Sequence, residues 1–69
     1  MERERMLTCA GLVPGDMIQA HVGTVLQFTG CVTETQADGE LFWAVDSIGQ
    51  RRLIDLGSYE VYRLYPPFL

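Results

Sequence analysis

The turn sequence Val-Pro-Gly-Asp at residues 13–16 and the glycine at position 30 constrain the fold of this chain more than any other feature. Proline and glycine set the backbone angles of a tight turn, and the Asp16 side chain can accept hydrogen bonds from nearby backbone amides. Residues 17–22 then carry an apolar side chain at every second position, as a half-buried strand does. Gly30 lies inside a second strand pattern, where a glycine typically marks a bulge or a bend. The spacing therefore predicts short strands that curve strongly.

Turn-forming residues divide the rest of the chain into further strand patterns. The Asp-Gly pair at 38–39 is typical of a hairpin turn, and no segment has the 3.6-residue apolar period of an amphipathic helix. Strands are predicted over residues 17–22, 24–35, 41–47, 51–56 and 61–65. The folded domain then spans residues 13–65. It follows a leader (1–12), whose first five residues we expect to be frayed, and precedes an apolar tail (66–69).

Length and composition indicate one folded domain. The chain has 69 residues, of which 48% are hydrophobic, so it can bury a core although it lies near the lower size limit for folding without disulfides or a metal. No apolar run approaches the ~20 residues of a membrane span. The charged first residues lead into no signal-peptide core, so we expect a cytoplasmic protein. The net charge of −4 argues against a general polyanion binder.

The turn and the spaced glycines resemble the KOW motif of small SH3-like barrels. That motif has a Gly-Asp entry, apolar residues two and four positions later, and spaced glycines that end in Gly-x-Val. The matching residues here are Gly15, Asp16, Ile18, Ala20, Gly23, Gly30 and Val32. The resemblance implies an all-β, five-stranded SH3-like barrel with a short 3₁₀ turn at residues 57–59, before the last strand. KOW domains contact RNA or protein partners. The layout is also similar to the plasmid-type dihydrofolate reductases, which assemble around a central pore.

The strand predicted at residues 41–45 is apolar on both faces. Its odd-numbered residues would share one face, and Phe42 and Ala44 the other, whereas a one-domain barrel has a single inside. Either the leader and the tail cover the second face, or that face contacts another subunit or a partner. We expect the latter, in a homodimer or higher homo-oligomer. The candidate partner-binding residues are Phe42, Trp43, Tyr62, Tyr65 and Phe68.

Three arginines form a candidate site for an anion or a nucleic acid. Arg51, Arg52 and Arg63 would lie together if the last two strands were neighbours, and guanidinium groups suit phosphate recognition. The alternative is that these arginines form solvated ion pairs with Asp55 and Glu60. The first interpretation would make the protein a nucleic-acid-associated, KOW-like regulator.

Nothing in the sequence indicates catalysis, a cofactor or a metal. His21 has no evident nucleophile beside it, and Cys9 and Cys31 lack both an activating neighbour and a metal-ligand spacing. We therefore expect a small interaction or regulatory module that binds a protein partner and is not an enzyme. A short chain of this kind is typical of accessory genes, including those of phages and mobile elements. The nucleic-acid regulator is the alternative, and an oligomeric pore enzyme like the plasmid reductases is a third possibility.

Overall fold

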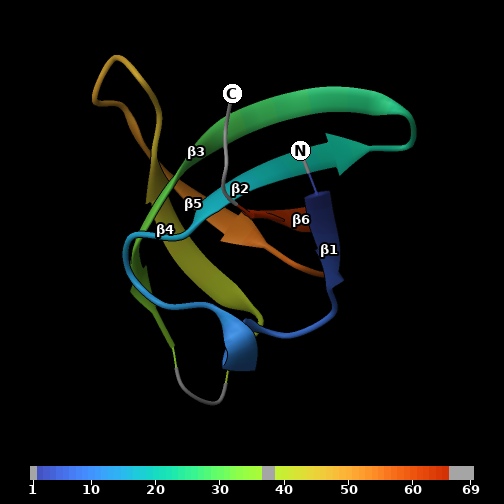
Figure 1. Ribbon diagram of the computed structural model, residues 1–69, viewed down its shortest axis with the longest axis horizontal. Helices are drawn as coiled ribbons and strands as arrows, with labels where there is room; N and C mark the ends of the chain where they lie inside the picture. Colours follow the sequence, from blue (N-terminus) through green and yellow to red (C-terminus); the bar gives the residue numbers. More distant parts are fainter. Residues whose placement is uncertain (1, 37–38, 66–69) are drawn as a thin grey trace.

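The structure is a computed structural model that describes residues 2–36 and 39–65, and it is all-β apart from one short 3₁₀ helix. Within these residues six antiparallel strands form one sheet, in the spatial order β1-β6-β2-β3-β4-β5 (Figure 1). The elements are β1 (Glu2–Met6), η1 (Cys9–Gly11), β2 (Met17–Val22), β3 (Val25–Thr35), β4 (Leu41–Val45), β5 (Arg51–Asp55) and β6 (Glu60–Tyr65). The all-β prediction is confirmed, and β2 to β6 lie where five strands were predicted, although β4 ends at Val45 and the sheet has a sixth strand, β1. The predicted tail and Phe68 lie outside the described residues.

Strand β1 was not expected from the sequence. Residues 2–5, which we predicted to be frayed, pair with β6 together with Met6, from Glu2 opposite Tyr65 to Met6 opposite Val61. The Met6 side chain is buried, so one apolar residue anchors an otherwise charged strand to the core. The leader then continues through η1, where the Thr8 side chain accepts a hydrogen bond from the Ala10 amide and caps the helix.

The long strand β3 joins the two halves of the curved sheet. Its Cys31 pairs with Met17 on β2 and also with Val45 on β4, and Figure 1 shows β2 and β3 extending together as a curved hairpin. The register shifts once between Ala20 and His21 and again between Val32 and Glu34. Gly30 itself pairs in register with Ile18, and the two irregularities lie on either side of it, at residues 26–28 and 32–34 of β3.

Gly30 itself is required by a close approach of the chain. A Cβ atom at this position would lie 2.6 Å from the Val45 carbonyl oxygen and 2.6 Å from the Phe28 ring. Both distances are shorter than any real van der Waals contact, so only glycine allows β3 and β4 to approach here while the Phe28 ring folds over the strand.

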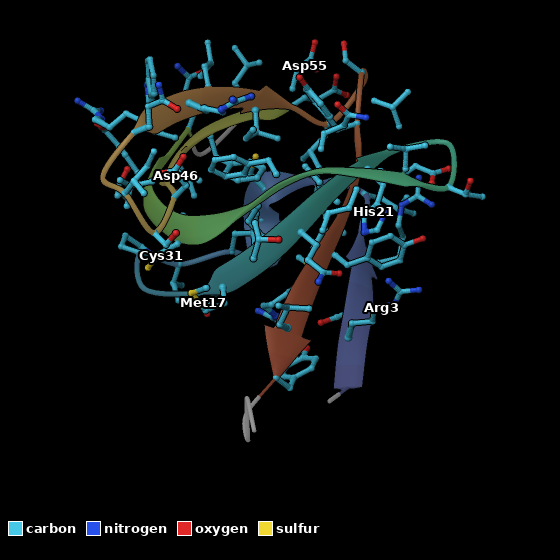
Figure 2. The ribbon with its side chains drawn as sticks, turned by 90° about the horizontal axis from the view of Figure 1, so that it is seen from above. Arg3, Met17, His21, Cys31, Asp46 and Asp55 are labelled. Atoms are coloured by element: carbon cyan, nitrogen blue, oxygen red, sulfur yellow. The ribbon has the colours of Figure 1, made fainter. Side chains whose placement is uncertain are left out.

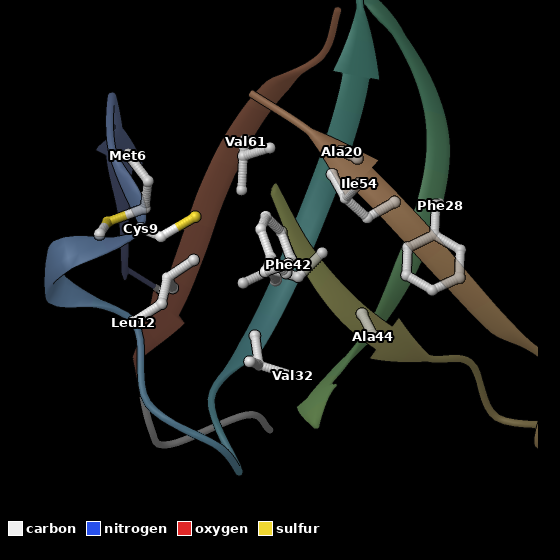
Figure 3. Packing of buried hydrophobic residues seen from close by; sticks show 11 residues of the cluster. Met6, Cys9, Leu12, Ala20, Phe28, Val32, Phe42, Ala44, Ile54 and Val61 are labelled. Carbon is white, nitrogen blue, oxygen red and sulfur yellow. The ribbon is translucent and has the colours of Figure 1, made fainter. Parts of the chain in front are cut away.

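The core lies on the concave side of the sheet, around Phe42 (Figure 3). Phe42 and Ala44 are both fully buried, so the face that we expected to contact a partner is the core face of β4. Phe42, which we predicted to contact a partner, is therefore not a surface residue of this folded chain. The buried cluster consists of Met6, Cys9, Leu12, Ile18, Ala20, Phe28, Val32, Phe42, Ala44, Ile54 and Val61.

Aspartate side chains hold the turns between strands. Asp16 accepts from the Val13 amide at 3.0 Å, as the turn sequence predicts, and Asp46 accepts from the amides of Ile48 and Gln50. At residues 57–59 we expected a 3₁₀ turn. The structure has a hydrogen-bonded turn there, which Asp55 closes by accepting from the Gly57 amide at 2.8 Å. No helix in the described part of the chain is long or apolar enough to cross a membrane.

Candidate interaction surface

The β4–β5 hairpin presents an apolar and basic surface on the side away from the core. Opposite pairs in this ladder alternate between the two faces of the sheet, and Phe42 with Ile54 occupies the buried face. The convex side therefore carries the alternate pairs, with Trp43 directly opposite Leu53. We call this surface the hairpin face; its residues are Leu41, Trp43, Val45, Arg51, Leu53 and Asp55.

Leu53 and Trp43 form the centre of the hairpin face. The Leu53 side chain stands 46% exposed, and Trp43 is half-buried. The Arg51 guanidinium lies 4.8 Å from the centroid of the Trp43 ring, within the range of a cation–π contact. Tryptophan and arginine are enriched among the few residues that carry most of the binding energy in protein interfaces.

Arg52 lies on the opposite face of β5 from Arg51. Its guanidinium is 5.5 Å from the centroid of the Phe28 ring, so it covers the end of the core instead of joining the hairpin face. Neither Arg51 nor Arg52 takes part in an ion pair among the residues that the structure describes. An open hollow of about 380 Å³ runs beside them and is lined by Gln50, Arg51, Arg52, Leu53, Ile54 and Tyr59.

Arg63 does not join these two arginines, so the predicted three-arginine site is not assembled. Its guanidinium donates to Glu4 at 2.6 Å and to the Tyr65 hydroxyl at 2.5 Å, and it lies 3.6 Å from Asp16. The reason is the strand order, because β5 lies at one edge of the sheet and β6 lies at the other end between β1 and β2. Arg63 therefore ties the leader and the first turn to β6. Glu60, which we expected to pair with one of these three arginines, instead lies 3.9 Å from Arg5.

This polar cluster shifts the pKa values of Glu4 and Arg63. The Tyr65 hydroxyl donates to the Glu4 carboxylate, and this bond, followed by the bond from Arg63, lowers the pKa of Glu4. Hydrogen bonds to Tyr65 and then to Glu4 raise the pKa of Arg63, which stays charged in any case. Tyr65 thus has its hydroxyl engaged inside the cluster rather than offered to a partner.

Tyr62 belongs to a separate surface on β1 and β6. The Arg3 guanidinium lies 4.3 Å from its ring centroid, and the His21 ring meets it edge-on at 5.4 Å. Figure 2 shows Arg3 and His21 near each other and well away from Asp46, which begins the β4–β5 turn. The predicted partner-binding residues therefore divide between the core, the hairpin face, the β1–β6 surface and the Arg63 cluster.

The two cysteines are free, and they differ in exposure. Cys9 is buried and its thiol donates to the Leu41 carbonyl, and burial, followed by the charge of Glu40, raises its pKa. A thiol in this state is a poor nucleophile. Cys31 is half-buried on β3. Within residues 2–36 and 39–65, no group of three His, Cys, Asp or Glu side chains is arranged to hold a metal ion.

Leu53 is the residue of the hairpin face that sequence reasoning did not single out. The signal was present, because the turn at residues 47–50 sets a register in which Leu53 faces Trp43. No family model, curated protein or solved structure matches the chain.

Proposed function

We propose that this protein is a small interaction module that binds a protein partner through the hairpin face. The observation that carries the proposal is the pairing of Trp43 with the half-exposed Leu53, with Arg51 stacked on the indole ring. An exposed apolar side chain beside an aromatic residue and an arginine is typical of the centre of a protein interface. The hollow beside β5 adds room for a partner side chain next to this pair.

We further propose that the fold is a small SH3-like barrel extended by β1. The support is the order β6-β2-β3-β4-β5, a meander of four strands whose first member pairs with the last strand of the chain. The tight turn between β5 and β6 agrees with this interpretation. β1 is then an addition to the edge of the barrel. Because one fold supports many functions, the proposed activity depends on the hairpin face and not on the fold.

The test is affinity capture from the native host with the full-length chain and two matched variants. Leu53→Asp places a charge at the centre of the hairpin face, and Leu7→Asp places one at a position that is 74% exposed in the loop after β1. We expect a partner that binds the wild type and Leu7→Asp to be lost with Leu53→Asp, at unchanged melting temperature. A partner that binds all three equally would place the interaction elsewhere and overturn the proposal.

A further inference from the structure

Among residues 2–36 and 39–65, no strand pairs with the outer edge of β5, and the backbone geometry of this edge follows from the bonds on its other side. The Asp46 amide donates to the Gln50 carbonyl at 3.0 Å, and the Leu56 amide donates to the Glu40 carbonyl at 2.8 Å. In an antiparallel ladder, the backbone N–H and C=O groups of every second residue point to the neighbouring strand. The even-numbered residues of β5 therefore direct these groups to β4. The amides of Arg51, Leu53 and Asp55 therefore point away from the sheet.

These outward amides belong to the residues of β5 that lie on the hairpin face. Along that face the strand presents a cation, an apolar residue and an anion, at Arg51, Leu53 and Asp55. The order is self-complementary, because the same strand running in the opposite direction presents an anion, an apolar residue and a cation. Opposite charges and apolar pairs placed directly across an antiparallel ladder stabilise it.

We propose that a second copy of this chain binds here, with its β5 antiparallel to the first and a two-fold axis at Leu53. Arg51 then lies opposite Asp55 of the second copy on both sides of the axis, and Leu53 lies opposite its own equivalent. The Leu53 amide and carbonyl of each chain bond to those of the other, so the two sheets become one.

The turn after β5 leaves the Asp55 amide and part of its carboxylate available to the second copy. Its backbone carbonyl already accepts from the amides of Ser58 and Tyr59, but its amide points to the open edge. Its carboxylate accepts one bond from Gly57 and one from Ser58, which leaves lone pairs for an arginine of the second copy. The turn bonds also hold the carboxylate in place before the second copy arrives.

Neighbouring registers are less favourable by charge. Moving the axis to Arg52 places two Arg52 guanidinium groups directly opposite each other, and moving it to Ile54 places Leu53 opposite Asp55. The other edge strand, β1, repels its own copy, because an axis at Glu4 places Glu4 opposite itself and Arg3 opposite Arg5. Charged edges of this kind prevent pairing between sheets, so β5 is the edge that accepts a second copy.

This dimer rests on the proposed function, because both require the hairpin face to be exposed. It deepens that proposal by naming a second copy of the chain as a partner for the same hairpin. Pairing would place the Trp43 residues of both copies on one continuous surface, one on each side of the axis. Five paired residues bury less area than a standard protein interface, which is about 800 Å² per partner. We therefore expect a reversible dimer that weakens as salt screens the two Arg51–Asp55 pairs.

A charge-swap experiment tests the register with the full-length chain, by sedimentation velocity over a concentration series. Arg51→Glu and Asp55→Arg each place like charges across the axis, so each alone is expected to dimerise about tenfold less tightly than the wild type. In an equimolar mixture each new residue meets an opposite charge, and the dimer is expected to return. Failure of the mixture to recover it would overturn the proposed register, and a wild type that stays monomeric at all concentrations would overturn the dimer.

A cross-linking measurement covers the case in which Asp55→Arg disturbs the turn. In a Cys31→Ser background, Leu53→Cys places two thiols beside the axis, whereas Ile48→Cys places them on the exposed β4–β5 turn. A short bis-maleimide should link Leu53→Cys chains and leave Ile48→Cys chains unlinked at the same concentration; equal yields would overturn the proposal.

The dimer and the proposed partner binding can fail separately. If the wild type is a monomer and still binds a partner in the affinity capture, only the dimer is overturned. If the wild type is a dimer and captures no partner, only the proposed partner binding is overturned.

Discussion

Arg63 on β6 donates to the Glu4 carboxylate on β1 across a separation of 59 positions in the chain. The same guanidinium donates to the Gly11 carbonyl and lies near Asp16, so one side chain connects β1, η1, the first turn and β6. The leader is thus part of the folded domain because its charged residues find partners on the last strand.

Replacing Glu4 by Gln should change how stability depends on pH. The pKa of Glu4 is lowered in the folded protein, so its contribution is complete above the unfolded pKa of about 4.3 and is lost as the pH falls through the lower folded value. We expect Glu4→Gln to be less stable than the wild type at pH 7, and the difference to shrink below about pH 4. Urea unfolding at a series of pH values measures this. Parallel stability curves for the two proteins would contradict it.

Tyr65→Phe tests which group lowers the pKa of Glu4. The hydroxyl of Tyr65 makes the largest contribution to the lowered pKa of Glu4, followed by Arg63. An NMR titration of the Glu4 carboxylate should therefore give a higher pKa in Tyr65→Phe than in the wild type. An unchanged pKa would mean that Arg63 alone sets the value.

Substitution of Gly30 should destabilise the fold strongly. In Gly30→Ala the new methyl group would lie 2.6 Å from the Val45 carbonyl oxygen, and backbone cannot move aside as a flexible side chain can. Overpacking of this kind costs about 1–3 kcal/mol or more, which is a large share of the stability of so small a domain. Thermal unfolding measures the loss. Thr29→Val on the exposed side of the same strand is the control and should change the melting temperature little; equal effects would contradict the steric explanation.

The two cysteines should differ in their reaction with a thiol reagent. Cys9 is 3% exposed, its thiol donates to the Leu41 carbonyl and its pKa is raised, whereas Cys31 is half-buried and more accessible. Under native conditions we expect one fast and one slow thiol, with the fast phase absent from Cys31→Ser. In denaturant both should react at similar rates. A fast phase that survives in Cys31→Ser would mean that the η1 region opens readily.

The strands β2 to β6 could be predicted because each is bounded by turn residues whose backbone preferences are local. β1 could not, because its Glu-Arg alternation has no apolar period and is held by β6 at the far end of the described chain. Local propensity contains no information about such a partner.

Strand β4 was predicted, but the face of it that we expected to contact a partner is the core face, and the opposite face belongs to the hairpin face. Alternation gives the period of a strand, and it does not say which face is inside when both are apolar. The choice is made by tertiary packing, in which Phe42 meets Ile54 across the hairpin and fills the centre of the core. Arg63 is a similar case, since its partners Glu4 and Asp16 come from segments that meet only in the folded sheet.

The position of β6 between β1 and β2 has a consequence for synthesis on the ribosome. Until the last strand has left the exit tunnel, β1 has no neighbour to pair with and the open side of β2 stays exposed. The hairpins β2–β3 and β3–β4 can form early, because their strands adjoin in sequence. Completion of the sheet therefore waits for the final strand, and a chain that stops before residue 60 has a sheet of β2 to β5 only, with the side of β2 that β6 would cover left unpaired.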